Sequence, residues 1–240
     1  MQALATGVLL SHGGHDMVVT ASHVLDSPDV QRQGAYILHD RVGFIDLGDF
    51  SFIRTDSAGD RIVDDALDIA VLFLEPGVAQ TLRNAGDFEF ATLSVTDDEG
   101  LSVPCAHFIH GFPLALTRPG EESIARVSLA CFLPLATDTE GCWKSDFPEA
   151  HLDLEYNRDL LARVAGTGDG LSLPTPEGFS GCGIWRVPLP GDGAVPTQVQ
   201  AALVGIVHRF NPSTNTIRAT RLEALLSVMF AAETTDPPDA

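Results

Sequence analysis

Short apolar runs rich in β-branched and aromatic residues recur along most of the chain, and turn residues separate them. At the start, ATGVLLS and MVVTAS flank the turn GGHD, a pattern typical of a β-hairpin. Further runs of this kind are AYILHD, RVGFIDL, FSFIRT, IAVLFLE, AHFIHGF, IARVSLACF, HLDLEY, GCGIWRV and ALVGIVHRF. Many short strands with turns at short intervals predict an all-β sandwich or barrel.

Helical periodicity is confined to two segments. Residues 77–86, GVAQTLRNAG, give a short and weak pattern, whereas residues 221–233, RLEALLSVMFAAE, predict an amphipathic C-terminal helix. The polar tail, residues 234–240, is expected to be disordered. An acidic, turn-rich segment near residue 95 suits a connection between two halves, so we divide the chain into residues 1–95 and 96–233.

The charge of the chain excludes several kinds of partner. Asp and Glu number 33 against 14 Lys and Arg, which gives a formal net charge of −19 at pH 7. Such a surface repels phosphate, so we expect neither nucleic acid nor a membrane as a partner. The chain has no apolar run of about 18 residues, and its N-terminus lacks the basic region of a signal peptide, so we expect a cytoplasmic protein.

Cysteine and histidine spacing argues against a metal site. The four cysteines form no CxxC pair. Cys131 and Cys142 could form a disulfide in an oxidising compartment, but in the cytoplasm we expect free thiols. The two histidines of AHFIHG would point to opposite faces of one strand, and those of SHGGHD fit an exposed hairpin turn. We therefore expect neither a metal nor a cofactor.

The stretch EGFSGCGIW, residues 177–185, places Ser180 between glycines. A serine in such a stretch is usually a turn residue, because glycine supplies positive φ and serine bonds to nearby backbone. A catalytic serine also needs a neighbouring base, usually histidine, and a carboxylate that orients the base. The motif alone does not decide between these two roles.

Two residues have a sequence context suited to the base and the carboxylate. His23, in VVTASHVLD, comes just after an apolar strand, where a short turn can present it at a domain edge. Asp68, in DDALDIAVLFLE, comes directly before another apolar strand. Taken singly, a histidine after a strand is most often a loop residue, and an aspartate before a strand is most often a turn residue.

The motifs T-A-x-H, D-I-A-V and G-x-S-G-x-G, in that order, resemble those of the trypsin-like serine proteases, which have the chymotrypsin fold. This resemblance implies an all-β chain of two six-stranded antiparallel Greek-key β-barrels with a C-terminal helix. It also implies that His23 is the general base, that Asp68 fixes its tautomer, and that Ser180 attacks the substrate. The N–H groups of Gly178 and Ser180 would form the oxyanion hole, and residues 204–207, VGIV, would line the specificity pocket.

Three departures from the common pattern narrow the resemblance. Val24 stands where many secreted members have a disulfide cysteine, and Cys182 replaces a usual glycine. Phe179 stands where zymogen-type members have an aspartate that pairs with a new N-terminus. These residues resemble the bacterial and viral branches of the family. We therefore expect no activation by removal of a propeptide. Because we expect a cytoplasmic protein, in which an unrestrained protease would be harmful, we also expect regulation by a protein partner.

The resemblance puts the base of the specificity pocket at Pro174, where no carboxylate is present to bind a Lys or Arg of the substrate. Thr175 fits the spacing of a threonine in bacterial glutamyl endopeptidases. Their pocket histidine, however, would correspond to Val207, and His208 lies one residue later, on the other face of a strand. His208 could equally pack near Asp68. We expect uncharged or acidic side chains to be preferred over basic ones.

These residues together predict a serine endopeptidase that cleaves protein or peptide substrates through an acyl-enzyme. An α/β-hydrolase is excluded, because Cys182 breaks its G-x-S-x-G motif and the chain lacks alternating helices. The alternative interpretation is a catalytically silent chymotrypsin-like domain that acts as a binding module, since a fold does not by itself imply a function.

Overall fold

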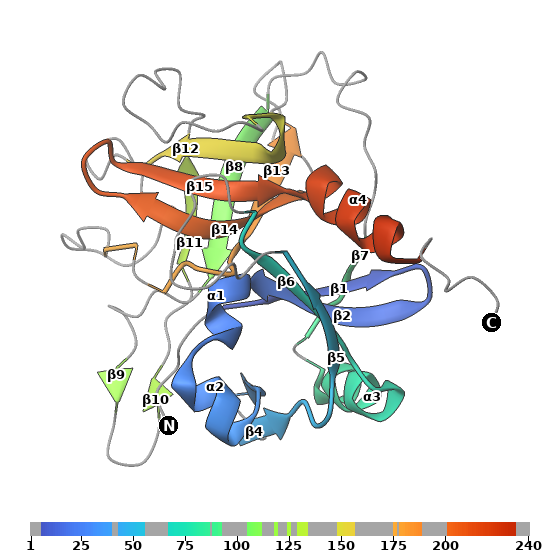
Figure 1. Cartoon of the computed structure of the whole chain (residues 1–240). Helices are drawn as coiled ribbons and strands as arrows, with labels where there is room; N and C mark the ends of the chain where they lie inside the picture. The colour runs from blue at the N-terminus through green and yellow to red at the C-terminus, as the bar shows by residue number, and fades with distance from the viewer. Residues whose placement is uncertain are drawn as a thin grey trace.

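The computed structural model describes the chain in twelve segments and is mostly β (Figure 1). The described residues are 6–39, 43–55, 67–86, 88–92, 105–111, 118–119, 124–125, 129–133, 148–156, 175–176, 178–188 and 201–233. Every run that the sequence predicts as a strand contains one in the structure. The predicted disordered tail and Cys142 lie outside the described residues. The segment that we expect to join the two halves lies mostly outside them.

A five-stranded sheet is formed by the N-terminal part of the chain, in the order β5-β6-β2-β1-β7. Its strands are β1 (Val8–His12), β2 (His15–Ala21), β5 (Ser51–Arg54), β6 (Ile69–Phe73) and β7 (Ala91–Thr92). The predicted hairpin is present as β1 and β2, and Gly13 and Gly14, with φ of 58° and 82°, supply its two-residue turn. β7 pairs with β1 in parallel, so this sheet is not antiparallel throughout.

Three helices and a separate hairpin surround the five-stranded sheet. The helices are α1 (Ser22–Leu25), α2 (Pro28–Gln33) and α3 (Pro76–Ala85), and the hairpin consists of β3 (Tyr36–His39) and β4 (Gly43–Asp46). α3 is the helix that the weak pattern of residues 77–86 predicts. Pro76 stands at its start and Gly86, with φ of 83°, ends it. Its buried residues Ala79 and Leu82 join a core cluster with Leu72 of β6.

A six-stranded antiparallel sheet is formed by the C-terminal part, in the order β11-β8-β13-β14-β15-β12. Its strands are β8 (Cys105–Gly111), β11 (Leu129–Leu133), β12 (His151–Glu155), β13 (Gly183–Pro188), β14 (Ala202–Asn211) and β15 (Thr216–Arg221). The short strands β9 (Arg118–Pro119) and β10 (Ile124–Ala125) form a further pair, and a 3-10 helix, Pro148–Ala150, precedes β12.

One hydrophobic core joins the two larger sheets. The C-terminal helix α4 (Leu222–Glu233) follows β15 directly, close to the predicted position of this helix. Buried residues of α4 pack together with buried residues of β14 and of the five-stranded sheet. The buried members of this cluster are Val8, Leu10, Met17, Val19, Ile69, Val71, Leu203, Ile206, Leu222, Leu225 and Met229. Figure 1 shows α4 beside the ends of β14 and β15, with the five-stranded sheet below the six-stranded one. This packing holds the ends of β2, β6 and β14 close to one another.

The strand β15 was not predicted from the sequence. The C-terminal helix was predicted to begin at residue 221, but Arg221 is the last residue of β15 and the helix begins at Leu222. Five strands, and not six, belong to the first sheet among the described residues. Within the described part of the chain, no helix is long and apolar enough to cross a membrane.

Candidate active site

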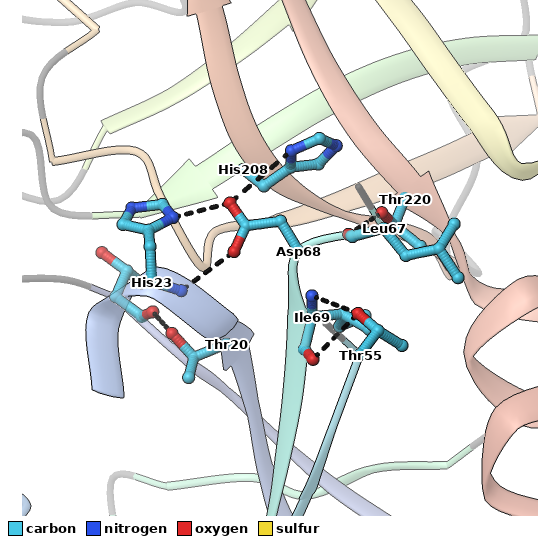
Figure 2. Close-up of polar contacts among 9 residues, drawn as sticks. Thr20, His23, Thr55, Leu67, Asp68, Ile69, His208 and Thr220 are labelled. Carbon is cyan, nitrogen blue, oxygen red and sulfur yellow. Dashed lines mark hydrogen bonds and ion pairs between the residues drawn. The ribbon is translucent and has the colours of Figure 1, made fainter. Parts of the chain in front are cut away.

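The pairing of β2 with β6 brings His23 and Asp68 together. In this antiparallel ladder Ala21 is opposite Ile69, so the residues just after β2 and just before β6 meet at the same end of the sheet. His23 lies in α1, which turns the chain there. His23 Nδ1 is 2.7 Å from Asp68 Oδ2, and the backbone N–H of His23 donates to Asp68 Oδ1 at 2.9 Å (Figure 2). Asp68 therefore uses both carboxylate oxygens to orient one residue.

The backbone around Asp68 is held in an uncommon conformation by contacts on both sides. Asp68 has a φ of 44°, a left-handed conformation that aspartate adopts more readily than most residues. Its carbonyl accepts a hydrogen bond from the N–H of Ser22 at 3.0 Å. The hydroxyl of Thr220 donates to the carbonyl of Leu67. The hydroxyl of Thr55 accepts from the N–H of Ile69 at 3.1 Å (Figure 2). These bonds come from three separate elements and fix the aspartate for its contact with His23.

The contact with Asp68 changes the acid–base properties of His23. The hydrogen bond that His23 donates to Asp68 raises the pKa of His23 above its ordinary value of 6.5, against the opposing effect of burial. Because Nδ1 carries the proton donated to the carboxylate, the lone pair of the neutral ring is on Nε2. A half-exposed histidine in this tautomer can accept a proton from a hydroxyl group at Nε2.

Two consecutive tight turns form the backbone around Ser180. The N–H of Phe179 donates to the carbonyl of Pro176 at 3.0 Å, and the N–H of Cys182 donates to the carbonyl of Phe179 at 2.9 Å. The third residue of each turn is a glycine with positive φ, 89° at Gly178 and 86° at Gly181, as a type II turn requires. Ser180 is thus the second residue of the later turn.

Within the described part of the chain, the turns leave two amide groups without acceptors. Phe179, Gly181 and Cys182 all donate their N–H groups to backbone carbonyls, whereas the N–H groups of Gly178 and Ser180 donate to no acceptor among the described residues. Two such amides on either side of one residue are the donor pattern of an oxyanion hole. The resemblance described above implies this role for the same two residues.

Hydrogen bonds connect the backbone at Ser180 and Gly181 to two segments that lie next to His23 and His208 in the chain. The N–H of Thr6 donates to the carbonyl of Ser180 at 3.1 Å, and the carbonyl of Thr6 accepts from the hydroxyl of Thr20 at 2.9 Å. Thr20 lies three residues before His23 in the chain. On the other side, the N–H of Gly181 donates to the carbonyl of Val207 at 2.7 Å.

His23 and Ser180 do not form a hydrogen bond with each other in this structure, so the direct contact is limited to His23 and Asp68. Catalytic hydrogen bonds are often long before substrate binds, so this arrangement is compatible with a base and a nucleophile.

The predicted pocket residues have separate locations. Thr175 is exposed, Val207 is buried in the core of the six-stranded sheet, and Pro174 lies outside the described residues. His208 is also buried, and its Nδ1 is 3.8 Å from Asp68 Oδ2 (Figure 2). Of the two locations that the sequence left open for His208, this is the one beside Asp68.

The threonines that hold this region were not identified from the sequence. Backbone groups around the candidate site form hydrogen bonds with the hydroxyls of Thr20, Thr55 and Thr220. The backbone of a fourth threonine, Thr6, binds both Ser180 and Thr20. Isolated threonines next to apolar runs give no recognisable pattern, because their function depends on contacts between distant parts of the chain. Within the described residues, no group of three or more His, Cys, Asp and Glu side chains could hold a metal ion.

Comparison with known proteins adds no relative. No protein-family model matches the chain, and a search of curated proteins found no match.

Proposed function

We propose that this chain is a serine endopeptidase that acts through an acyl-enzyme. The observation that carries the proposal is the pairing of both His23 N–H groups with the two carboxylate oxygens of Asp68. In the proposed reaction, Ser180 Oγ attacks the carbonyl carbon of a peptide bond while its proton moves to His23 Nε2. His23 then donates this proton to the leaving amine, and water releases the acyl group by the same route. The N–H groups of Gly178 and Ser180 would stabilise the oxyanion.

The proposal extends to the fold and the location. We propose that the five-stranded sheet with the β3–β4 hairpin and the six-stranded sheet correspond to the two Greek-key barrels of a chymotrypsin-like protein, with the site between them. The contact between Asp68 of the first part and His208 of the second supports this placement. We also propose a cytoplasmic location, and the absence of a disulfide at Cys105 and Cys182, among the described residues, is consistent with a reducing compartment.

Apolar side chains pack next to the Ser180 turn in the core of the six-stranded sheet. Phe179, Tyr156 and Val207 belong to one buried apolar cluster, and the rings of Tyr156 and Phe179 meet edge to face with centroids 6.0 Å apart. The sequence offers no carboxylate at Pro174 either. Because Pro174 offers no partner for a basic side chain, we propose that a Lys or Arg before the cleaved bond is disfavoured. We also propose that a protein partner controls the activity.

A fluorophosphonate probe tests this proposal, because the probe labels only a serine that a base activates. Wild-type protein should be labelled, Ser180→Ala should not, and the exposed Ser213→Ala variant should be labelled like the wild type. His23→Ala should slow labelling by several orders of magnitude. Labelling that survives in Ser180→Ala would contradict the assignment. No labelling of the folded wild type, alone or with cell extract, would favour a binding module instead.

A further inference from the structure

His208 occupies an irregular position in β14. Val207 is opposite Ala219 of β15 and Arg209 is opposite Arg218, so His208 is an extra residue between two paired positions. A bulge of this kind redirects a side chain relative to the regular alternation of a strand. Figure 2 shows the His208 ring directed toward the Asp68 carboxylate, on the side away from the His23 backbone. The bulge thus places a second imidazole next to the carboxylate that His23 binds.

Burial keeps the His208 ring neutral. Its side chain is only 4% exposed, and burial lowers the pKa of His208 to about 3. The charged and titratable groups around it come from four places: Asp68 before β6, His23 of α1, His151 of β12 and Arg218 of β15. Asp68 alone among them favours a proton on the ring, and Arg218 is itself bound to Asp153 by two hydrogen bonds of 2.8 Å.

The neutral ring has one proton, and its surroundings determine which nitrogen carries it. Nδ1 faces Asp68 Oδ2, whereas Nε2 is buried without a hydrogen-bond partner among the described residues. A proton on Nε2 would leave a buried donor unsatisfied and direct the lone pair of Nδ1 at a carboxylate. We therefore assign the proton to Nδ1, so that the N–H dipole of His208 is directed at Asp68.

We propose that His208 is a positioning residue whose Nδ1–H points at Asp68 Oδ2, the oxygen that His23 binds, and thereby limits how tightly the carboxylate holds the His23 proton. This inference rests on the proposed function for its catalytic meaning. The separation of 3.8 Å is longer than a hydrogen bond, so the interaction is an oriented dipole beside a charge. It stabilises the carboxylate without adding a positive charge next to His23. Without it, His23 would hold its proton to a higher pH and be a base over a narrower range.

Asparagine and glutamine at position 208 separate this effect from packing. An Asn amide can place its N–H near the position of Nδ1, whereas a Gln amide reaches toward the position of Nε2. Titration of ¹³C,¹⁵N-histidine-labelled protein by NMR should show the His23 transition unchanged in His208→Asn. In His208→Gln and His208→Leu it should move up by about half a pH unit to one unit. The probe-labelling rate at pH 7 should fall about threefold to tenfold in the latter two variants only.

The same NMR experiment gives a direct test on the wild type. The ¹⁵N shifts of His208 should show a protonated Nδ1 and an unprotonated Nε2; the opposite tautomer would overturn the proposal even if every variant failed to fold. An equal His23 transition in the Asn, Gln and Leu variants would also overturn it. If the probe fails to label the wild type while the NMR results hold, the proposed function is wrong and the His208–Asp68 interaction stands.

Discussion

Acidification should destabilise this protein through one buried histidine. In the folded chain burial lowers the pKa of His208 to about 3, whereas in the unfolded chain the group titrates near 6.5. Between these two values the unfolded state binds a proton that the folded state excludes, so folding stability falls as the pH falls. The contribution is absent above the unfolded value and grows as the pH drops toward 3.

The size of this effect follows from the two pKa values. Each pH unit well within the interval changes the free energy of unfolding by about 1.4 kcal/mol. Since His208 is already partly titrated near pH 6.5 in the unfolded chain, the change from pH 7 to pH 5 amounts to about 2 kcal/mol. His23 acts in the opposite direction, because its pKa is raised in the folded state. Its stabilisation is complete below 6.5 and is lost as the pH rises through the folded value.

Urea unfolding at pH 7 and pH 5, for the wild type and for His208→Asn, measures the His208 contribution alone. All other titrating groups occur in both proteins, so their effects cancel in the comparison. The wild type should lose about 2 kcal/mol more than the variant between the two pH values. An equal loss in both proteins would refute the reasoning, because it would show that position 208 takes up no proton on unfolding.

Three further predictions concern the candidate site. The rate of probe labelling should fall as the pH drops through a value above 6.5, since the raised pKa of His23 leaves its ring protonated there; a rate that stays constant down to pH 5 would contradict this. Asp68→Asn should return the His23 transition, followed by NMR, toward 6.5, whereas the control Asp26→Asn should change it little, because Asp26 is the weakest of the named influences. Gly181→Ala should prevent correct folding or abolish labelling, because its Cβ would lie 1.7 Å from a backbone oxygen, while Gly77→Ala, with open space around it, should leave both unchanged by thermal unfolding and labelling.

The strands could be anticipated from the sequence because they depend on local patterns, whereas the contact between His23 and Asp68 was expected only from the resemblance of the motifs around these residues. Apolar β-rich runs gave the positions of β2 and β6, and the two residues stand just beyond the ends of these runs. The register that makes them neighbours, Ala21 opposite Ile69, is a property of the folded sheet.

β15 could not be predicted because its sequence, TIRATR, is mostly polar. The structure nevertheless buries Arg218 and Thr220 in this strand. Arg218 is compensated by Asp153 on the neighbouring strand β12, and Thr220 by the carbonyl of Leu67. Partners so far apart in the sequence make a polar run compatible with burial, and no local pattern reveals them. The bulge that turns His208 toward Asp68 could not be predicted from the sequence either, because the alternating pattern of a strand assumes regular pairing.

Phe179 explains how the two candidate oxyanion amides can be ordered without an N-terminal ion pair. Its ring is 1% exposed and packs edge to face on Tyr156, so the residue between the two amides is anchored in the core of the six-stranded sheet. Its own N–H and carbonyl close the two successive turns. Both turns therefore depend on one buried side chain, and neither turn bond uses the amide of Gly178 or of Ser180. An aspartate at this position could not be buried in the same way without a charged partner, whereas a phenylalanine needs only the apolar cluster that already surrounds it.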